Sequence, residues 1–174
     1  MITSRILPID YQQLDYIESK GNQYIDTGVT ANQNISIQVD GWMLTPHSLY
    51  GTTTGLNVTA SSANVGGYFY YWNRNSTGAA GSSSEFRRCV YTQRKNKCFR
   101  NNKLVSSFPL QNFTDNQTIY LFCRHNYSTV DDIGRCRIYS CIIWDNDIMI
   151  RNMIPCYRIV DSEIGMYDLI NNKF

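Results

Sequence analysis

The amino-acid sequence predicts an all-β protein folded as a two-sheet antiparallel sandwich. No helical period of apolar residues persists over three turns of helix. Short runs of β-branched and aromatic residues alternate instead with turn-forming residues, at a spacing that gives roughly a dozen short strands. Tyrosine (13) outnumbers phenylalanine (7), and Asn, Ser and Thr fill the loops, a composition typical of sandwiches.

The strongest strand signal runs from Arg137 to Trp144, where nearly every residue is β-branched, aromatic or cysteine. Such a run predicts a central strand packed on both faces. The turn-forming residues 145–147 (Asp-Asn-Asp) interrupt it, and Ile148-Met149-Ile150 resumes it. We therefore expect a hairpin whose second arm ends at Pro155.

The chain is long enough for one domain. At 174 residues it can bury roughly two-thirds of its unfolded surface without disulfides or metals. We place an N-terminal arm at residues 1–12 and a single domain at residues 13–174. Apolar Ile6, Leu7 and Ile9 indicate that the arm docks on another surface.

Three strands are expected near the start of the domain. Leu14 to Ser19 and Asn22 to Thr27 flank Lys20-Gly21, which predicts an opening hairpin. Apolar residues alternate with polar ones from Ile35 to Val39, the pattern of a strand with one solvated face. That strand is expected to continue to Leu44 and to end at Pro46.

The middle of the chain is less regular. The stretch from Ser48 to Thr59 fits either two short strands or one strand and a loop. Residues 68–72 (Tyr-Phe-Tyr-Tyr-Trp) form a strand with aromatic side chains on both faces, and the small residues 76–84 form a loop.

Further strands are expected in the second half. Phe86 to Gln93 and Lys97 to Phe99 flank a basic turn, and Asn101-Asn102 predicts another hairpin, with Leu104-Val105 as its returning arm. Ile119 to Cys123 is a buried strand, and a loop from His125 to Asp132 is expected to join it to the central strand.

Two sets of residues, one at each end of the chain, resemble a known family. They are Leu14-Asp15-Tyr16-Ile17-Glu18-Ser19, Gln23-Tyr24-Ile25-Asp26-Thr27-Gly28, Arg137-Ile138-Tyr139-Ser140-Cys141, Trp144-Asp145-Asn146, Met153-Ile154-Pro155-Cys156, Ile164-Gly165-Met166-Tyr167-Asp168-Leu169 and Asn172-Lys173-Phe174. The series resembles a laminin-G-like, concanavalin A-like domain of the type found in proteins of gut bacteria and their phages. The resemblance implies an all-β, two-sheet antiparallel jelly-roll β-sandwich whose closing segment pairs beside the opening hairpin. It implies no ligand.

The candidate ligand or interface residues lie on and just after the aromatic strand. Tyr68, Tyr70 and Trp72 share one face, and Asn73 and Arg74 follow. A sugar ring stacks on Tyr or Trp while its hydroxyls bond to Asn or Arg. Tyr, Trp and Arg are also enriched in protein interfaces, and aromatic residues fill sandwich cores. Core, interface and glycan site all remain open for this strand.

The sequence predicts no catalytic residues. Glycoside hydrolysis on this fold needs two carboxylates across the scissile bond, whereas Glu18, Glu85 and Glu163 are isolated in sequence. His47 and His125 have no nucleophile motif near them and are interpreted as surface residues. We therefore expect a protein that is not an enzyme.

No metal site or cofactor is predicted. Asp131-Asp132 and the acidic turn at 145–147 are the clusters that could hold calcium, and both are interpreted as loop and turn formers. The six cysteines are expected to be reduced, and most of them lie in strands, where a thiol packs as a small hydrophobe. Cys89 and Cys98 are the pair most able to form a disulfide.

The leading functional hypothesis is a phage structural or adhesion module of the virion: a capsid decoration, head-fibre or tail-associated protein. We see no signal peptide and no transmembrane stretch, so production in the host cytoplasm is expected. The expected partners are other virion proteins and further copies of the chain. A net charge of +2 without a basic stripe argues against nucleic acid as a partner. The alternative hypothesis is a carbohydrate-binding, lectin-like module that contacts surface glycans.

Overall fold

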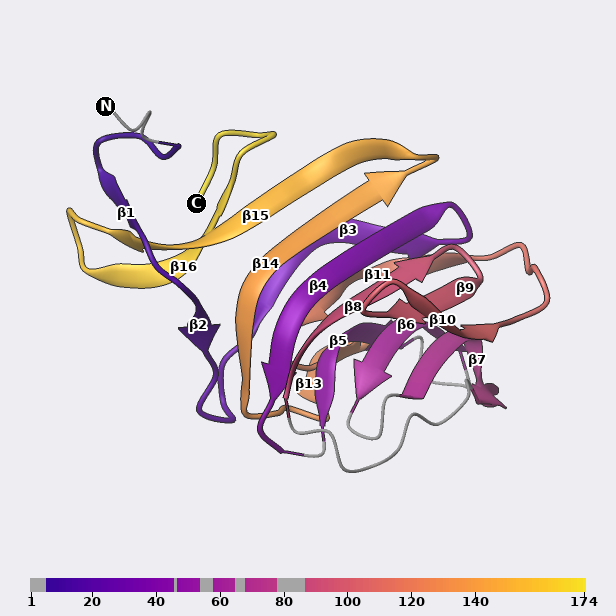
Figure 1. The fold of residues 1–174 in the computed structure, drawn as a ribbon. Coiled ribbons are helices and arrows are strands. Elements are labelled where there is room, and N and C mark those ends of the chain that lie inside the picture. Colours follow the sequence, from indigo (N-terminus) through magenta and orange to yellow (C-terminus); the bar gives the residue numbers. More distant parts are fainter. Residues whose placement is uncertain (1–5, 46, 54–57, 65–67, 78–86) are drawn as a thin grey trace.

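The computed structural model describes residues 6–45, 47–53, 58–64, 68–77 and 87–174 (Figure 1). For residues 53, 58–64 and 68–77 it describes the backbone alone. The described residues form sixteen β-strands and no helix, which confirms the all-β prediction.

The strands form two sheets that pack face to face as a sandwich. The first sheet contains β1 (Tyr11–Gln13), β2 (Ile17–Glu18), β4 (Ile35–Met43), β8 (Arg88–Arg94), β9 (Lys97–Arg100), β10 (Lys103–Ser107), β14 (Cys136–Asp145), β15 (Ile148–Arg158) and β16 (Glu163–Asp168). The second contains β3 (Ile25–Asn32), β5 (Ser48–Thr53), β6 (Val58–Asn64), β7 (Tyr68–Thr77), β11 (Thr114–Leu121), β12 (Arg124–Asn126) and β13 (Thr129–Asp131). Almost all ladders are antiparallel, and β12 pairs with β5 in parallel. The predicted two-sheet antiparallel sandwich is confirmed, and its architecture is consistent with a jelly roll.

The core lies between the two sheets and follows the alternation of their strands. Ile37 and Val39 of β4 point inward, and so do Ile119 and Leu121 of β11; all four are fully buried. Each such side chain contributes about 1.5–3 kcal/mol through removal of apolar surface from water.

The predicted central strand is confirmed as β14, which pairs with β4 on one side and with β2 and β15 on the other. Its inward residues, such as Ile138 and Ile143, are fully buried, but Arg137, Tyr139 and Trp144 on the outer face are only half-buried. The expectation of packing on both faces was therefore wrong. No further layer covers this face among the described residues.

Pro155 does not end the second arm of the hairpin, because β15 continues through it to Arg158. The Leu14 N–H donates to the Pro155 carbonyl, so the missing N–H of Pro155 faces the side where β15 changes its partner from β14 to β1. A proline at that point interrupts no ladder bond.

The predicted opening hairpin is also wrong. β2 pairs with β14 in one sheet, whereas β3 pairs with β11 in the other. The turn at Lys20-Gly21 therefore carries the chain from one sheet to the other, and Gly21 takes a positive φ of 101° there.

The other expected elements are found with changed limits. The region from Ser48 to Thr59 holds β5 and the start of β6, so two strands is the correct alternative. The strand expected from Ile35 ends at Met43, and Pro46 lies outside the described residues. The segment from His125 to Asp132, expected as a loop, contains most of the short β12–β13 hairpin.

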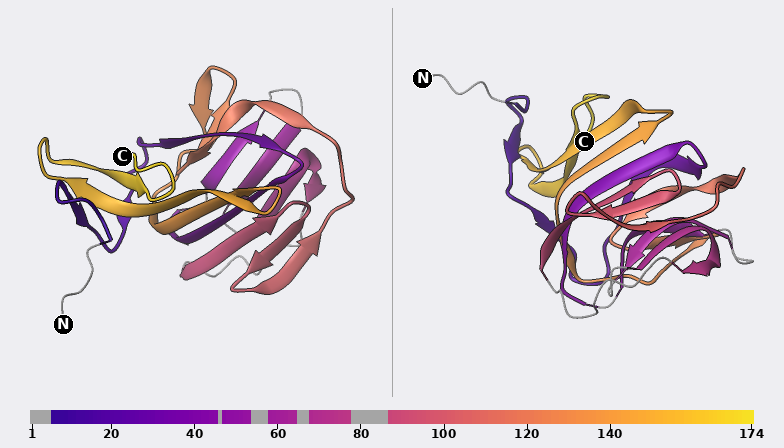
Figure 2. Two further views of the ribbon diagram at one scale, coloured as in Figure 1. Left: turned by 90° about the horizontal axis from the view of Figure 1, so that it is seen from above. Right: turned by 45° about the vertical axis from the view of Figure 1, so that its right-hand side comes forward.

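One part of the first sheet projects from the sandwich as a lobe, which consists of residues 6–13 with β1, the second half of β15 and the turn after it, β16 and the C-terminal segment. Figures 1 and 2 show it extending to one side of the two sheets. The lobe has its own small core of buried Leu7, Cys156 and Tyr167. The closing strand pairs with β15, not with the opening segment as expected, and Phe174 instead reaches that segment by stacking on Tyr11 at 5.7 Å between ring centroids.

No helix that could span a membrane occurs in the described parts of the chain.

Candidate functional site: a cleft between the two sheets

A cleft of about 520 Å³ lies where the edge of the second sheet meets the lobe. Residues 24–28, at the start of β3, line one wall and residues 163–166 of β16 line the other; Arg151 and Asp168 also line it. The volume falls within the range of small-ligand sites.

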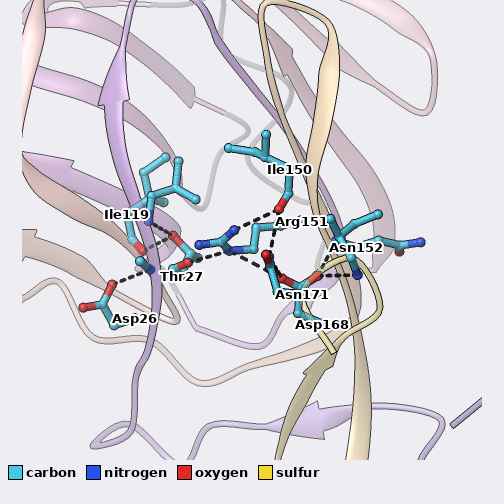
Figure 3. Close-up of polar contacts among 11 residues, drawn as sticks. Asp26, Thr27, Ile119, Ile150, Arg151, Asn152, Asp168 and Asn171 are labelled. Carbon is cyan, nitrogen blue, oxygen red and sulfur yellow. Dashed lines mark hydrogen bonds and ion pairs between the residues drawn. The ribbon is translucent and has the colours of Figure 1, made fainter. Parts of the chain in front are cut away.

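Arg151 ties the two sheets together beside this cleft (Figure 3). Its Nε atom donates to the Thr27 carbonyl of β3 at 3.0 Å, and its Nη1 atom donates to the Ile150 carbonyl at 2.9 Å. The Asp168 carboxylate lies 3.6 Å from the same Nε atom. The Arg151 guanidinium therefore hydrogen-bonds the Thr27 carbonyl at the edge of the second sheet. It also balances the charge of the buried Asp168 carboxylate in the first sheet.

The carboxylate of Asp168 is the main hydrogen-bond acceptor beside Arg151, and Asp168 is only 6 % exposed. We call Arg151, Asp168 and their partners the Asp168 corner. Its Oδ1 atom accepts the backbone N–H groups of Asn152 and Ile170, at 2.9 and 3.1 Å. Its Oδ2 atom accepts the Asn171 side chain at 2.5 Å. The carboxylate is thus committed to structure and has little capacity left for a ligand.

The β3 wall of the cleft is closed by its own side chains. Asp26 accepts the Gly28 N–H at 2.8 Å, and the Thr27 hydroxyl accepts the Val29 N–H at 3.2 Å. Gly28 has a positive φ of 66°, which bends the strand and which a side chain would oppose. The N–H groups of Gly28 and Val29 are therefore already hydrogen-bonded to side chains of the same strand.

An aromatic side chain stands at the mouth of the cleft. Tyr24 stacks on Tyr120 at 4.6 Å, and Tyr120 stacks on His125 at 4.0 Å, with interplanar angles of 9° and 10°. His125, expected at the surface, is half-buried in this stack and its Nδ1 atom lies 3.0 Å from the Thr118 carbonyl. The stack fixes Tyr24, which is still about half exposed, as a rigid wall.

A second polar and aromatic surface covers the outer face of the first sheet. Tyr16 and Tyr139 lie 5.5 Å apart, and the guanidinium of Arg88 lies 3.7 Å from the centre of the Tyr139 ring. Arg88 also forms two hydrogen bonds with Asp40, of 2.9 and 2.6 Å. A hollow of about 410 Å³ beside these rings is lined also by residues 13–15. We call Tyr16, Tyr139 and Arg88 the outer-face cluster.

The predicted ligand or interface residues cannot be placed at either surface. The predicted strand exists as β7, at the edge of the second sheet. The side chains of Tyr68, Tyr70, Trp72, Asn73 and Arg74 lie outside the described residues. Their role stays a prediction.

Three carboxylates line the cleft, although no local sequence pattern indicates that they lie near one another. They are Asp26, Glu163 and Asp168. Each accepts hydrogen bonds from the protein, and the partner of Glu163 is Arg158. A general acid at neutral pH needs a raised pKa. Burial raises the pKa of Asp115, but Asp115 lies under Thr52 inside the sandwich and does not line the cleft.

The acidic pair considered for calcium is engaged with the protein. Asp131 accepts from Arg124 at 3.0 Å and from Asn126 at 2.9 Å. Asp132 contacts His47 at 3.2 Å and also accepts from Ser48. Among the described residues no group of three or more His, Cys, Asp or Glu side chains could hold a metal ion.

All six cysteines are buried and free, which confirms the expectation of reduced thiols. The proposed Cys89–Cys98 pair is not possible in this register. Cys98 lies opposite Gln93, four residues along β8 from Cys89, so the two α-carbons are separated by roughly 13 Å. A disulfide requires less than about 7 Å.

Searches of protein-family models, curated proteins and solved structures find no match to this chain.

Proposed function

We propose that the protein is a non-enzymatic structural and adhesion module of a phage particle, made in the host cytoplasm and assembled through its lobe. The resemblance of both chain ends to the concanavalin A-like domains of gut phages and bacteria supports this setting. The observation that carries the proposal is the apolar surface at one end of the lobe.

This surface, the lobe patch, consists of Ile6, Ile9, Ile159 and Val160. Ile9 is 73 % and Val160 83 % exposed. The Ile159 N–H donates to the Asp10 carbonyl at 2.9 Å, which brings the arm and the turn after β15 together. Exposed apolar groups gathered in one place on a projecting element are typical of a surface that another protein covers. Further copies of the chain or other virion proteins are the partners we propose.

Light scattering on the eluted peak of a size-exclusion column tests the proposal. The wild-type protein is expected to elute as an oligomer, and Val160→Asp is expected to reduce its mass toward that of one chain. Leu104→Asp is the matched control, because Leu104 is also more than half exposed but lies on β10, away from the lobe. A wild-type monomer at high concentration would contradict the proposal.

A second candidate function, glycan binding, is favoured by the outer-face cluster. Tyr16 and Tyr139 offer apolar ring surface to the C–H groups of a sugar, and Arg88 with Gln13 and Asp15 offers partners for its hydroxyls. A panel of glycans from gut bacterial surfaces tests it with Tyr139→Ala. The control is Tyr127→Ala, since Tyr127 is exposed on the other sheet's β12–β13 turn. A panel without any binding would remove this candidate.

A further inference from the structure

The direction in which each backbone group of β15 points can be read from its bonds to β1. Leu14 N–H donates to the Pro155 carbonyl, and Ile159 N–H donates to the Asp10 carbonyl. Positions 155, 157 and 159 of β15 therefore face β1. Since successive residues of a strand point their backbone groups to opposite sides, positions 154, 156 and 158 face β16.

The same alternation then fixes β16. Tyr167, Gly165 and Glu163 lie opposite positions 154, 156 and 158, so their N–H and C=O groups face β15. The backbone groups of Ile164, Met166 and Asp168 must face the other way. That side of β16 is the wall of the 520 Å³ cleft, which Ile164 and Met166 line.

One of these three outward positions already has a strand partner. Asp168 N–H donates to the Lys173 carbonyl at 2.7 Å, and Lys173 N–H donates to the Asp168 carbonyl at 3.3 Å, as in an antiparallel ladder. Within the described residues no hydrogen bond occupies the outward backbone groups of Met166 and Ile164. Among the described residues no strand lies beside Ile164 and Met166 on this side of β16.

The opposite wall of the cleft differs in this respect. At β3 the Gly28 and Val29 N–H groups are held by neighbouring side chains, and Arg151 occupies the Thr27 carbonyl. Natural proteins commonly protect sheet edges by such means against pairing with other chains. The β16 edge lacks this protection although the same cleft exposes it.

We infer that the β16 edge accepts an extended peptide segment of another polypeptide chain, added as a strand antiparallel to β16. Backbone bonds to Ile164 and Met166 supply its affinity, in the manner of β-strand addition. Residues of the segment that lie opposite these two share their face of the sheet, where Ile164 is 61 % exposed and Tyr24 forms the other wall. The segment is therefore expected to carry apolar residues at alternate positions and no proline at a bonded position. The inference rests on the proposed assembly role only in naming another protein chain as the donor.

The test uses the full chain and the capped peptide Lys-Thr-Val-Thr-Val-Thr-Lys as the probe. Amide hydrogen exchange by nuclear magnetic resonance is expected to slow at Ile164 and Met166 when the peptide is added. The same peptide with N-methylated valines is expected to have no effect, since it keeps the side chains but loses donors. Unchanged exchange at both amides with millimolar peptide, or equal protection by the methylated peptide, would overturn the inference.

A pair of variants at one position tests the backbone directly. Ile164→Pro removes an N–H that faces the cleft and takes part in no bond to β15, whereas Ile164→Ala shortens the side chain and keeps the N–H. Proline is expected to weaken peptide binding about tenfold, and alanine no more than about threefold. Equal binding by the two variants, or protection by cellobiose in place of the peptide, would overturn strand addition. The failure of this inference can be told apart from the failure of the proposed assembly. If Val160→Asp lowers the oligomer mass but the wild-type protein does not bind the peptide, only strand addition is rejected.

Discussion

Burial opposes the ionisation of five cysteine thiols, of which Cys156 lies in the core of the lobe and the others lie in the sandwich. Burial raises the pKa of Cys123 to about 12 and that of Cys156 to about 11. The pKa values of Cys98, Cys136 and Cys141 are raised further. These cysteines act as small apolar side chains, as their positions in strand-like runs predicted.

The thiols predict how stability depends on pH. In the unfolded chain they ionise near pH 9, whereas in the folded protein they stay neutral until the pH reaches their raised pKa values. Their contribution is thus complete below about pH 8 and is lost as the pH rises toward 11 and beyond. Urea denaturation under reducing conditions is expected to show a falling free energy of unfolding between pH 8 and pH 10. A free energy that is constant or rises over this range would contradict the burial of the thiols.

At this scale the sequence predicted which residues are apolar and reduced, but not which polar residues are buried. Asp168 is an example, since nothing within its own segment shows that Asn152 and Arg151 surround it. Its neighbours come from β15, whose pairing with β16 is a tertiary feature. Local patterns carry no signal for such contacts.

Removal of the Asp168 carboxylate measures how much the Asp168 corner contributes to the free energy of unfolding. Asp168→Ala would leave the Asn152 and Ile170 N–H groups without their acceptor and Arg151 without its counter-charge. We expect a loss of about 3 kcal/mol in the free energy of unfolding by chemical denaturation. The control Asp161→Ala removes an exposed partner of Arg158 and is expected to leave the denaturation midpoint unchanged. Equal losses of unfolding free energy in the two variants would show that the Asp168 corner does not stabilise the fold.

Single elements were predicted best where a turn has a local signature. The β9–β10 turn has positive φ at Asn101 and Asn102, and the β14–β15 turn has positive φ at Asn146 and Asp147. Such paired positive angles belong to two-residue hairpin turns, which Asn and Asp tolerate. Both hairpins were predicted from these residues alone.

The β14–β15 turn offers a substitution with a defined sign. Asp147 has a φ of 68°, a conformation that glycine adopts without strain. Asp147 also lies 3.3 Å from Lys95, but it is 81 % exposed and the ion pair adds little. Thermal unfolding is expected to show Asp147→Gly as stabilised by about 0.5 kcal/mol and Asp147→Val as destabilised. A more stable valine variant would contradict the turn conformation.

Elements whose partners are distant in sequence were predicted less well. The hairpin expected around Lys20-Gly21 is absent because β2 and β3 pair instead with β14 and β11, more than eighty residues away in the sequence. Turn residues state that the chain reverses but not whether it stays in the same sheet. The end predicted for the second hairpin arm at Pro155 was wrong for a related reason. Whether a proline interrupts a ladder depends on which neighbouring strand its nitrogen faces, and here that neighbour, β1, is distant in sequence.

For the whole molecule, the fold class followed from the number and spacing of strands, while the lobe and the cleft did not. The lobe joins residues 11–13 to the second half of β15, and the cleft joins residues 24–28 to residues 151–168. No periodicity links segments so far apart in the chain. The lobe is also the part of the molecule on which our functional account depends, because it carries both the exposed lobe patch and the open β16 edge.

Assembly through the lobe is tested most directly by hydrogen–deuterium exchange of the wild-type protein at low and high concentration, followed by peptide mass spectrometry. We predict slower exchange at high concentration in peptides that cover residues 6–13 and 156–164, and unchanged exchange in peptides that cover β10. Exchange independent of concentration throughout the lobe, or protection confined to β10, would contradict the account.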